Sequence, residues 1–193
     1  DDGGCGFCTN PDSHHVTMLN DYAHDIGPGG GQSIHGFYIH GHDHKVQNSF
    51  AVNNPGGYGI HLYNSGQGVD NNIVSGNVVH GNSAVGMLIG YGDNNIAYNN
   101  IVYNNGGYGV EIRNSGNNQV YNNTIVGNSY AGINWHNADS GIARNNVLWQ
   151  NNAPFSTSSG SAGTEDHNVI NDPHFVNQST SNYHLQSDSI AVS

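Results

Sequence analysis

Basic residues are nearly missing from this sequence. Lys and Arg together number three among 193 residues, against 14 Asp and Glu, and the formal net charge is −11. A protein that binds DNA, RNA or an anionic membrane surface needs a row of basic side chains to displace counterions. The composition therefore argues against a nucleic-acid partner. It also predicts that a polyanionic sugar is repelled unless Ca²⁺ bridges it to the protein.

Long apolar runs are missing as well. No segment approaches the roughly eighteen consecutive apolar residues of a membrane-spanning helix, so we expect no membrane span. The first residues, DDGG, do not resemble a secretory signal peptide, and we expect the chain to be a mature or trimmed form.

Cysteine is limited to Cys5 and Cys8, in the sequence CGFC. A redox role of the thioredoxin type requires a strand before this motif and a helix after it, and the Gly-rich surroundings predict neither. We expect a local disulfide; free thiols, and a metal site completed by His14 or His15, are the alternatives. A disulfide indicates an oxidising compartment, which predicts a secreted or extracellular location.

Glycine and asparagine dominate what is present. The sequence has 28 Gly and even more Asn, while 9% of its residues are charged and 35% are hydrophobic. The hydrophobic residues recur at fixed intervals, unlike those of a disordered chain. At this length we expect one ordered, loop-rich and strand-based unit.

Five segments of the chain repeat one pattern around a glycine. The glycines are Gly36, Gly59, Gly86, Gly109 and Gly132, in steps of 23, 27, 23 and 23 residues. The positions one and three residues after each glycine are apolar, as in a strand with one buried face. These pairs are Phe37/Ile39, Ile60/Leu62, Met87/Ile89, Val110/Ile112 and Ile133/Trp135. The spacing indicates that one structural unit is stacked repeatedly.

Asparagine recurs in two columns of the same repeat. The columns are Asn77, Asn100, Asn123 and Asn146, and Asn82, Asn105, Asn128 and Asn151. Amides stacked at one position per turn can hydrogen-bond to one another at a tight bend. Aliphatic residues between the columns predict a further strand in each repeat. We therefore expect an all-β, single-stranded parallel β-helix of about seven coils, with a period of about 23 residues and Asn ladders.

The repeat also divides the chain. We expect an N-terminal Gly/Cys-rich segment over residues 1–12, β-helix coils over residues 13–152, and a final coil with a cap over residues 153–193. The last boundary follows from the end of the repeat near Asn152 and from the Ser/Thr-rich loops beyond it.

Several segments resemble the right-handed parallel β-helix, or pectate-lyase-like, superfamily. They are NNIVSGNVVHGN, NNIAYNNIVYNN, NNQVYNNTIVGN and the ending NDPHFVNQSTSNYHLQSDSIA, which is similar to the close of many secreted bacterial members. The resemblance covers residues 13–190 and implies right-handed coils and a secreted protein. It also implies a polysaccharide partner, bound in an elongated groove along one sheet.

Two outward columns of one predicted sheet carry most of the candidate functional residues. Two residues after the repeat glycine stand Tyr38, His61, Leu88, Glu111 and Asn134, and four residues after it stand His40, Tyr63, Gly90, Arg113 and His136. An exposed strip must carry some residue type, and Tyr and His are acceptable strand residues. The functional alternative is that aromatic rings stack on sugars while the polar groups hydrogen-bond or move protons.

The residues on adjacent early coils suit removal of the C5 proton of a uronic acid, as in a polysaccharide lyase or a C5-epimerase. We expect the catalytic group to be Tyr38, His40, His61 and Tyr63, because adjacent coils lie about one interstrand spacing apart. His61 or His40 would be the base, and Tyr38 or Tyr63 would be the acid.

Later coils continue the columns with residues suited to substrate binding. Arg113 would hold a carboxylate and Glu111 would orient the guanidinium. Asn134 and His136 extend this surface by one coil. A glycosidase fits less well, because it needs paired carboxylates and Glu111 is the only acid in the two columns.

The segment HGFYIH is similar to the YGFDPH-type motif of mannuronan C5-epimerases with this fold. The likeness covers His35, Gly36, Phe37 and His40, whereas Tyr38 and Ile39 stand where the motif has Asp and Pro. We expect His35 itself at a bend or facing inward, in a structural role.

Histidines alternate at His40, His42 and His44. On a continuing strand they would share one face, and with Asp43 or His15 they could hold Zn²⁺ or Cu²⁺. Ca²⁺ is a further candidate, through a column of turn carboxylates. The column is Asp43, Asp93 and Asp139. Solvated histidines and ordinary turn residues are the alternatives.

Three classes of function follow from the sequence. The first is a secreted carbohydrate-active enzyme, and the second is a glycan-binding module that uses the same groove without catalysis. The third is a structural or filament-forming protein, because the open ends of a β-helix can pair end to end with further copies.

Overall fold

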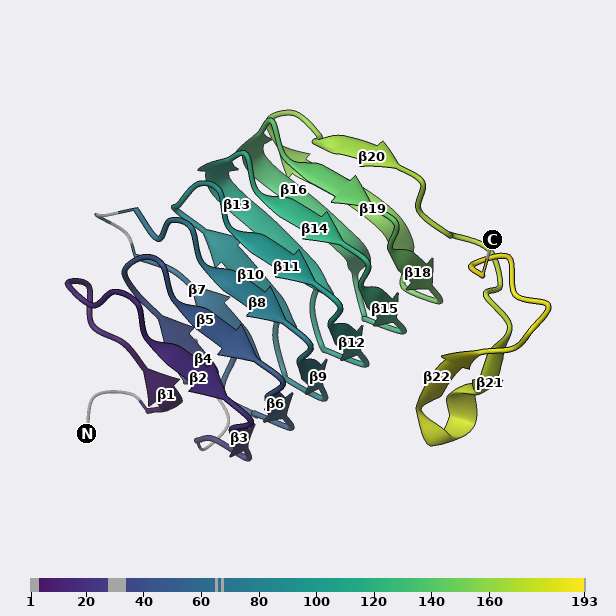
Figure 1. The fold of residues 1–193 in the computed structure, drawn as a ribbon, viewed down its shortest axis with the longest axis horizontal. Coiled ribbons are helices and arrows are strands. Elements are labelled where there is room, and N and C mark those ends of the chain that lie inside the picture. Colours follow the sequence, from purple (N-terminus) through teal and green to yellow (C-terminus); the bar gives the residue numbers. More distant parts are fainter. Residues whose placement is uncertain (1–3, 28–33, 65, 67, 193) are drawn as a thin grey trace.

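The chain winds into a solenoid with three parallel sheets, each built from one short strand per coil (Figure 1). The computed structural model describes residues 4–27, 34–64, 66 and 68–192. The first sheet contains β1 (Cys5–Cys8), β4 (His35–Ile39), β7 (Ile60–Leu62), β10 (Met87–Gly90), β13 (Val110–Gly116), β16 (Ala131–Asp139) and β19 (Ala153–Ser159). The predicted parallel β-helix is confirmed.

The other two sheets use the remaining short strands of each coil. The second sheet contains β2 (Thr17–Leu19), β5 (Lys45–Gln47), β8 (Ile73–Ser75), β11 (Ile96–Tyr98), β14 (Gln119–Tyr121), β17 (Ile142–Arg144) and β20 (Thr164–Asp166). The third contains β3 (Tyr22–His24), β6 (Phe50–Val52), β9 (Val78–His80), β12 (Ile101–Tyr103), β15 (Thr124–Val126) and β18 (Val147–Trp149). Strands thus come also from the predicted end segments, 1–12 and 153–193.

The core lies inside the coils and consists of the predicted inward pairs. All ten residues of these pairs are at most 1% exposed. The largest is Trp135, whose indole Nε1 donates to Glu165 Oε1 at 2.7 Å, so its one polar atom is satisfied. The hydrophobic alternation of period two therefore identified the buried face correctly.

Asparagine side chains tie successive coils together. Asn77 Nδ2 donates to Asn100 Oδ1 at 3.0 Å, and Asn100 Nδ2 donates to Asn123 Oδ1 at 2.9 Å. Each acceptor oxygen also receives a backbone N–H from the preceding coil, as Asn100 Oδ1 does from Asn77 at 3.0 Å. The second predicted column forms the same ladder, with Asn82 Nδ2 donating to Asn105 Oδ1 at 2.9 Å. Buried amides are satisfied in this way at bends.

The repeated Asn-Asn pairs form the corners of the coils. In the pair Asn99 and Asn100, the first residue has a φ of 55° and is exposed, while the second is buried in the ladder. Asn tolerates this left-handed conformation better than most residues do, so the first Asn turns the chain. A third buried column, Asn72, Asn95 and Asn118, was not predicted. Asn72 Nδ2 donates to Asn95 Oδ1 at 3.0 Å, whereas Asn95 Nδ2 has no partner in the described part of the chain.

A small antiparallel hairpin follows the last coil. It comprises β21 (Phe175–Asn177), a short 3₁₀ turn at Gln178–Thr180, and β22 (Asn182–Leu185). The ring of Tyr183 lies 5.1 Å from Phe175 within the hairpin and 5.1 Å from Tyr103 of β12. These contacts hold the hairpin against the third sheet. None of the described residues forms a helix long and apolar enough to span a membrane.

Candidate functional site

The two outward columns lie side by side on the first sheet. The register aligns Tyr38, His61, Leu88, Glu111 and Asn134 in one row, and Gly90, Arg113 and His136 in the next. The first row is not an exposed strip, because His61 is 6% exposed and Leu88, Glu111 and Asn134 are at most 1% exposed. This row therefore forms the buried floor of the face.

Aromatic side chains gather around His61 at one end of this face. Six residues form what we call the His–Tyr cluster: His35, Tyr38, His40, Tyr58, His61 and Tyr63. The centroid of the His61 ring lies 4.4 Å from that of His35, 4.6 Å from Tyr58, and 5.0 Å from both Tyr38 and Tyr63. The rings of Tyr38 and His40 are 4.2 Å apart. The four predicted catalytic residues are therefore brought together, and two further residues join them.

A chain of hydrogen bonds determines which nitrogen of His61 carries the proton. The backbone N–H of Tyr58 donates to His35 Nδ1 at 3.3 Å, and His35 Nε2 lies 3.0 Å from His61 Nδ1. A neutral imidazole has one N–H and one acceptor nitrogen, so His35, which accepts at Nδ1, donates from Nε2. His61 then accepts at Nδ1 and holds its proton on Nε2. This Nε2 is buried without a partner among the described residues, so His61 presents an unused donor.

Burial disfavours the charged forms of several residues of the cluster. It lowers the pKa of His35 to about 4. Burial also places the pKa of His61 well below its usual range, and the charges of His35 and Arg113 act in the same direction. The pKa of His40 is lowered by burial, and the pKa of Tyr38 is raised by burial and by Tyr63. The cluster therefore offers neutral imidazoles beside the protonated phenol of Tyr38.

Glu111 forms the centre of a second polar group on the same face. Its Oε1 accepts from Arg113 Nη2 at 2.8 Å and Nε at 3.2 Å, and from Asn134 Nδ2 at 3.3 Å. Its Oε2 is buried and has no hydrogen-bond partner in the described part of the chain. His136 Nδ1 lies 2.9 Å from Ser158 Oγ, beside this group. Arg113 is thus held by Glu111 and keeps its other N–H groups for a ligand.

The face continues into an open hollow of about 250 Å³ near its far end. Tyr108, Tyr130, Asn152 and Ser156 are among the residues that line it. The ring centroids of Tyr108 and Tyr130 are 5.3 Å apart, and the ring planes meet at 62°. Aromatic rings and hydroxyls therefore accompany the first sheet beyond the Glu111 group.

The alternating histidines do not share one face. Strand β4 ends at Ile39, and the left-handed φ values of Gly41 (84°) and Asp43 (57°) turn the chain, so the alternation of side chains is lost. His42 Nδ1 pairs with Asp43 Oδ2 at 2.7 Å, whereas His44 is buried and its Nδ1 accepts from the N–H of Val16. His40 lies instead against Tyr38.

The carboxylate column serves the turns. Asp93 Oδ1 accepts from the backbone N–H of Gly116 at 2.6 Å, and Asp70 Oδ1 accepts from the N–H of Asp93 at 2.7 Å. Asp139 is exposed and is aligned with Gly116 of the preceding coil. Over residues 4–27, 34–64, 66 and 68–192, no group of three or more His, Cys, Asp or Glu side chains is arranged to hold a metal ion. The sulfur atoms of Cys5 and Cys8 lie together on β1.

Comparison with known proteins identifies the fold family. Residues 5–190 match the family described as the right-handed β-helix region. The chain belongs to this family. No protein of curated function matches the sequence significantly.

Two solved structures place this β-helix among known folds. The A-module of the mannuronan C-5 epimerase AlgE6 from Azotobacter vinelandii has a TM-score of 0.67 and 16% identity, over 89% of this chain and 55% of that one. A mutant of the periplasmic alginate epimerase AlgG has a TM-score of 0.58 and 20% identity, over 86% and 48% of the two chains. The chain therefore spans about half the length of these structures. At such identities the likeness shows the fold.

Two members of the His–Tyr cluster of this β-helix were missed by sequence reasoning. The sequence places His35 at a bend or facing inward, and it gives no role to Tyr58. A Cβ on Gly59 would meet Val79 and Asn82 inside the coil, so the glycine and the residue after it both point inward at the corner. The residue before each glycine therefore faces outward. A tyrosine recurs directly before the repeat glycine, as Tyr58 before Gly59 and Tyr108 before Gly109. This recurrence could have revealed the outward position.

Proposed function

We propose that this β-helix protein is carbohydrate-active and binds a polysaccharide along the outer face of the first sheet. Uronic acid residues would be converted at the His–Tyr cluster, by lyase or C5-epimerase chemistry. The observation that supports this most is the buried His61 Nε2, an N–H without a protein partner in the described chain. An unsatisfied buried donor is costly, and a ligand oxygen would satisfy it.

The hydrogen bonds around His61 favour His40 as the base. His61 Nε2 already holds a proton, so His61 would donate a hydrogen bond to a substrate oxygen. His40 has a pKa lowered by burial and would be neutral at pH 7, with a lone pair able to accept the C5 proton. Arg113 would bind the uronate carboxylate with the N–H groups that Glu111 leaves unused.

Tyr38 or Tyr63 would return a proton. In the lyase reaction the C5 proton goes to His40, a double bond forms between C4 and C5, the C4–O4 bond breaks, and a tyrosine protonates the leaving oxygen. In the epimerase reaction the C4–O4 bond stays intact and a tyrosine protonates C5 on the opposite face. The raised pKa of Tyr38, caused by burial and by Tyr63, keeps its phenol protonated until it donates.

Incubation with alginate, pectate and glycosaminoglycans in D₂O, with and without Ca²⁺, tests the proposal. NMR would detect deuterium at C5, and ultraviolet absorbance would detect unsaturated uronates. We expect conversion that falls by about 100-fold or more in His40→Gln. Tyr98→Phe, on the second sheet, is the matched control and should keep full activity. A folded protein that gives neither signal with any polymer would exclude uronate conversion.

A glycan-binding protein without catalysis is the second candidate. Two observations favour it: the net charge of −11 opposes a polyuronate, and the aromatic hollow at Tyr108 and Tyr130 suits stacking on neutral sugars. Retention of an unconverted glycan, weakened at least tenfold in Tyr108→Ala, would support this alternative. Loss of retention in His40→Gln with no conversion of any polymer would support it equally.

A location outside the cytoplasm is part of the same proposal. The adjacent sulfur atoms of Cys5 and Cys8 suit an oxidising compartment. One of the structurally similar proteins, AlgG, is a periplasmic enzyme. Non-reducing peptide mapping of protein exported to a bacterial periplasm should recover a Cys5–Cys8 disulfide. Free thiols in that sample would remove this support.

A further inference from the structure

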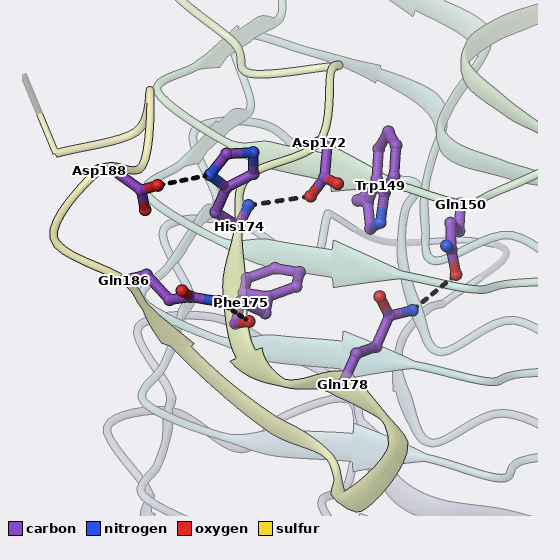
Figure 2. A pocket seen from close by; sticks show the side chains of 8 residues that line it. All are labelled: Trp149, Gln150, Asp172, His174, Phe175, Gln178, Gln186 and Asp188. Atoms are coloured by element: carbon purple, nitrogen blue, oxygen red, sulfur yellow. Dashed lines mark hydrogen bonds and ion pairs between the residues drawn. The ribbon is translucent and has the colours of Figure 1, made fainter.

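An open hollow lies between the third sheet and the C-terminal segment (Figure 2). Its volume is about 460 Å³, within the range of about 300–1,000 Å³ that is usual for small-molecule sites. Trp149 and Gln150 line it from the solenoid, and the segment around β21 supplies the opposite wall. None of the residues of the His–Tyr cluster takes part.

The hollow exists because the chain leaves the last coil two residues before the end of β18. Val169 pairs with Val147, and the N–H of Leu148 donates to Val169 O at 2.8 Å, so the chain covers the first part of β18. The segment then departs before it reaches Trp149. In earlier coils a following strand covers this position, as Trp149 itself covers Val126. The indole at the end of the third sheet is therefore left half-buried, with one side toward the hollow.

The opposite wall is fixed in place by aromatic packing and hydrogen bonds. Phe175 is 8% exposed and its ring lies 5.1 Å from Tyr183, which contacts β12. Gln178 Nε2 donates to Gln150 Oε1 at 2.6 Å and joins the two walls. Gln186 Nε2 donates to Phe175 O at 2.9 Å. The hollow is thus held open by contacts that do not fill it.

Several polar groups of the walls keep hydrogen-bonding capacity toward the hollow. Asp172 Oδ1 accepts from the N–H of His174 at 2.9 Å, and its second oxygen is left for another donor. Gln150 uses its oxygen for Gln178 and keeps both amide protons. His174 Nδ1 pairs with Asp188 Oδ2 at 3.3 Å at the rim. An aromatic face beside carboxylate and amide groups matches a sugar ring, which is apolar on its faces and carries hydroxyls at its edge.

We propose that this hollow is a second carbohydrate site, separate from the first sheet, and that it takes a neutral saccharide. The ring stacks on Trp149, and its hydroxyls donate to Asp172 and accept from Gln150. The choice of a neutral sugar follows from charge: the described lining contains Asp172 and Asp188 and no Lys or Arg, so a uronate would be repelled.

Tryptophan fluorescence gives a direct test, because the protein has two Trp residues and Trp135 is fully buried. We would titrate the whole chain with oligosaccharides of glucose, xylose, mannose, galactose and N-acetylglucosamine, and with oligogalacturonate. A neutral sugar should change the Trp149 emission and protect it from acrylamide quenching. The oligogalacturonate should bind at least tenfold more weakly. If no neutral sugar of the panel changes the emission, the proposal is wrong.

Variants separate this site from the first sheet. Calorimetry should show at least tenfold weaker binding in Trp149→Ala and in Asp172→Ala, the second of which removes no packed ring. Tyr63→Phe is the matched control, since it alters the His–Tyr cluster and should leave this affinity unchanged. A neutral sugar whose affinity falls in Tyr63→Phe but not in Asp172→Ala would place binding on the first sheet and overturn the proposal.

Discussion

At the scale of single residues, the position of one proton assigns the roles in the His–Tyr cluster. The backbone N–H of Tyr58 makes Nδ1 the acceptor nitrogen of His35, and the proton on His35 Nε2 then makes Nδ1 the acceptor nitrogen of His61. Residue types alone allow either histidine of the predicted pair to be the base. The hydrogen bonds make His61 a donor, and in the reaction that we propose they leave proton removal to His40. In that proposal His35 is a positioning residue, because it acts through His61.

The first residue-scale prediction concerns the proton on His61. Nitrogen-15 NMR of the histidine rings should find His61 as the Nε2–H tautomer at neutral pH, with Nδ1 as an acceptor. In His35→Ala the donor to Nδ1 is lost, so the His61 signals should shift toward a tautomer mixture. His24→Ala, at an exposed site, should leave them unchanged. An Nδ1–H tautomer of His61 in the unmodified protein would contradict the assignment.

The second residue-scale prediction concerns stability against pH. The pKa of His35 is about 4 in the folded protein and about 6.5 in an unfolded chain, so the unfolded state binds a proton first as the pH falls. The contribution of neutral His35 to stability should be complete above about pH 6.5 and decline toward about pH 4. Denaturant unfolding across this window should show a shallower decline in His35→Gln. An unchanged slope would argue against this origin.

At the scale of the element, the coil corner explains what could be predicted from the sequence and what could not. The strand alternation identified the inward pairs, and two Asn columns identified the ladders. The third column escaped because it contains only three asparagines: Gly141 stands 23 residues after Asn118, where the next one would be. His35 and Tyr58 escaped because the repeat glycine and the residue after it both face inward at the corner. The alternation of inward and outward positions is therefore broken there, and the residue before the glycine faces outward. The turn at Gly41 likewise separated histidines that alternate in sequence.

The element-scale prediction compares the two members of one Asn-Asn pair. Asn100→Ala leaves the backbone N–H of Asn77 without its acceptor and removes one hydrogen bond each from the Asn77 amide, Val74 O and Asn123 Oδ1. This should lower the free energy of unfolding by about 3 kcal/mol or more. Asn99→Gly keeps the left-handed turn and should change it by less than about 0.5 kcal/mol. Equal effects in urea unfolding would refute the ladder argument.

At the scale of the whole molecule, the sheets have open edges at the N-terminal end of the solenoid. Strands β1, β2 and β3 are the first members of the three sheets, and each has a described neighbour on one side. Backbone groups on the other side can pair with a further strand. The net charge of −11 opposes contact between copies at low salt. Filament formation therefore depends on whether backbone pairing exceeds this repulsion.

The whole-molecule prediction is end-to-end association that increases with salt. Sedimentation should give a mass that rises with protein concentration at high ionic strength and stays monomeric at low ionic strength. Val16 and Asn20 bond to the next coil, so the N–H of Leu19 points to the open edge. Leu19→Pro should reduce association, because proline cannot donate there. A monomer under all these conditions would exclude a role in filaments.

The one-way sense of the Asn ladders gives the later coils a modular character. In the column that starts at Asn77, each side-chain amide donates to the Asn of the following coil, so each coil presents the same acceptor to the coil before it and the same donor to the coil after it. Excision of the 23 residues from Asn100 to Asn122 would bring Asn77 opposite Asn123. The amide of Asn77 would then donate to the side-chain oxygen of Asn123, in place of that of Asn100. Gene duplication or deletion of whole units could thus lengthen or shorten the protein without altering its early, irregular coils, where the His–Tyr cluster lies.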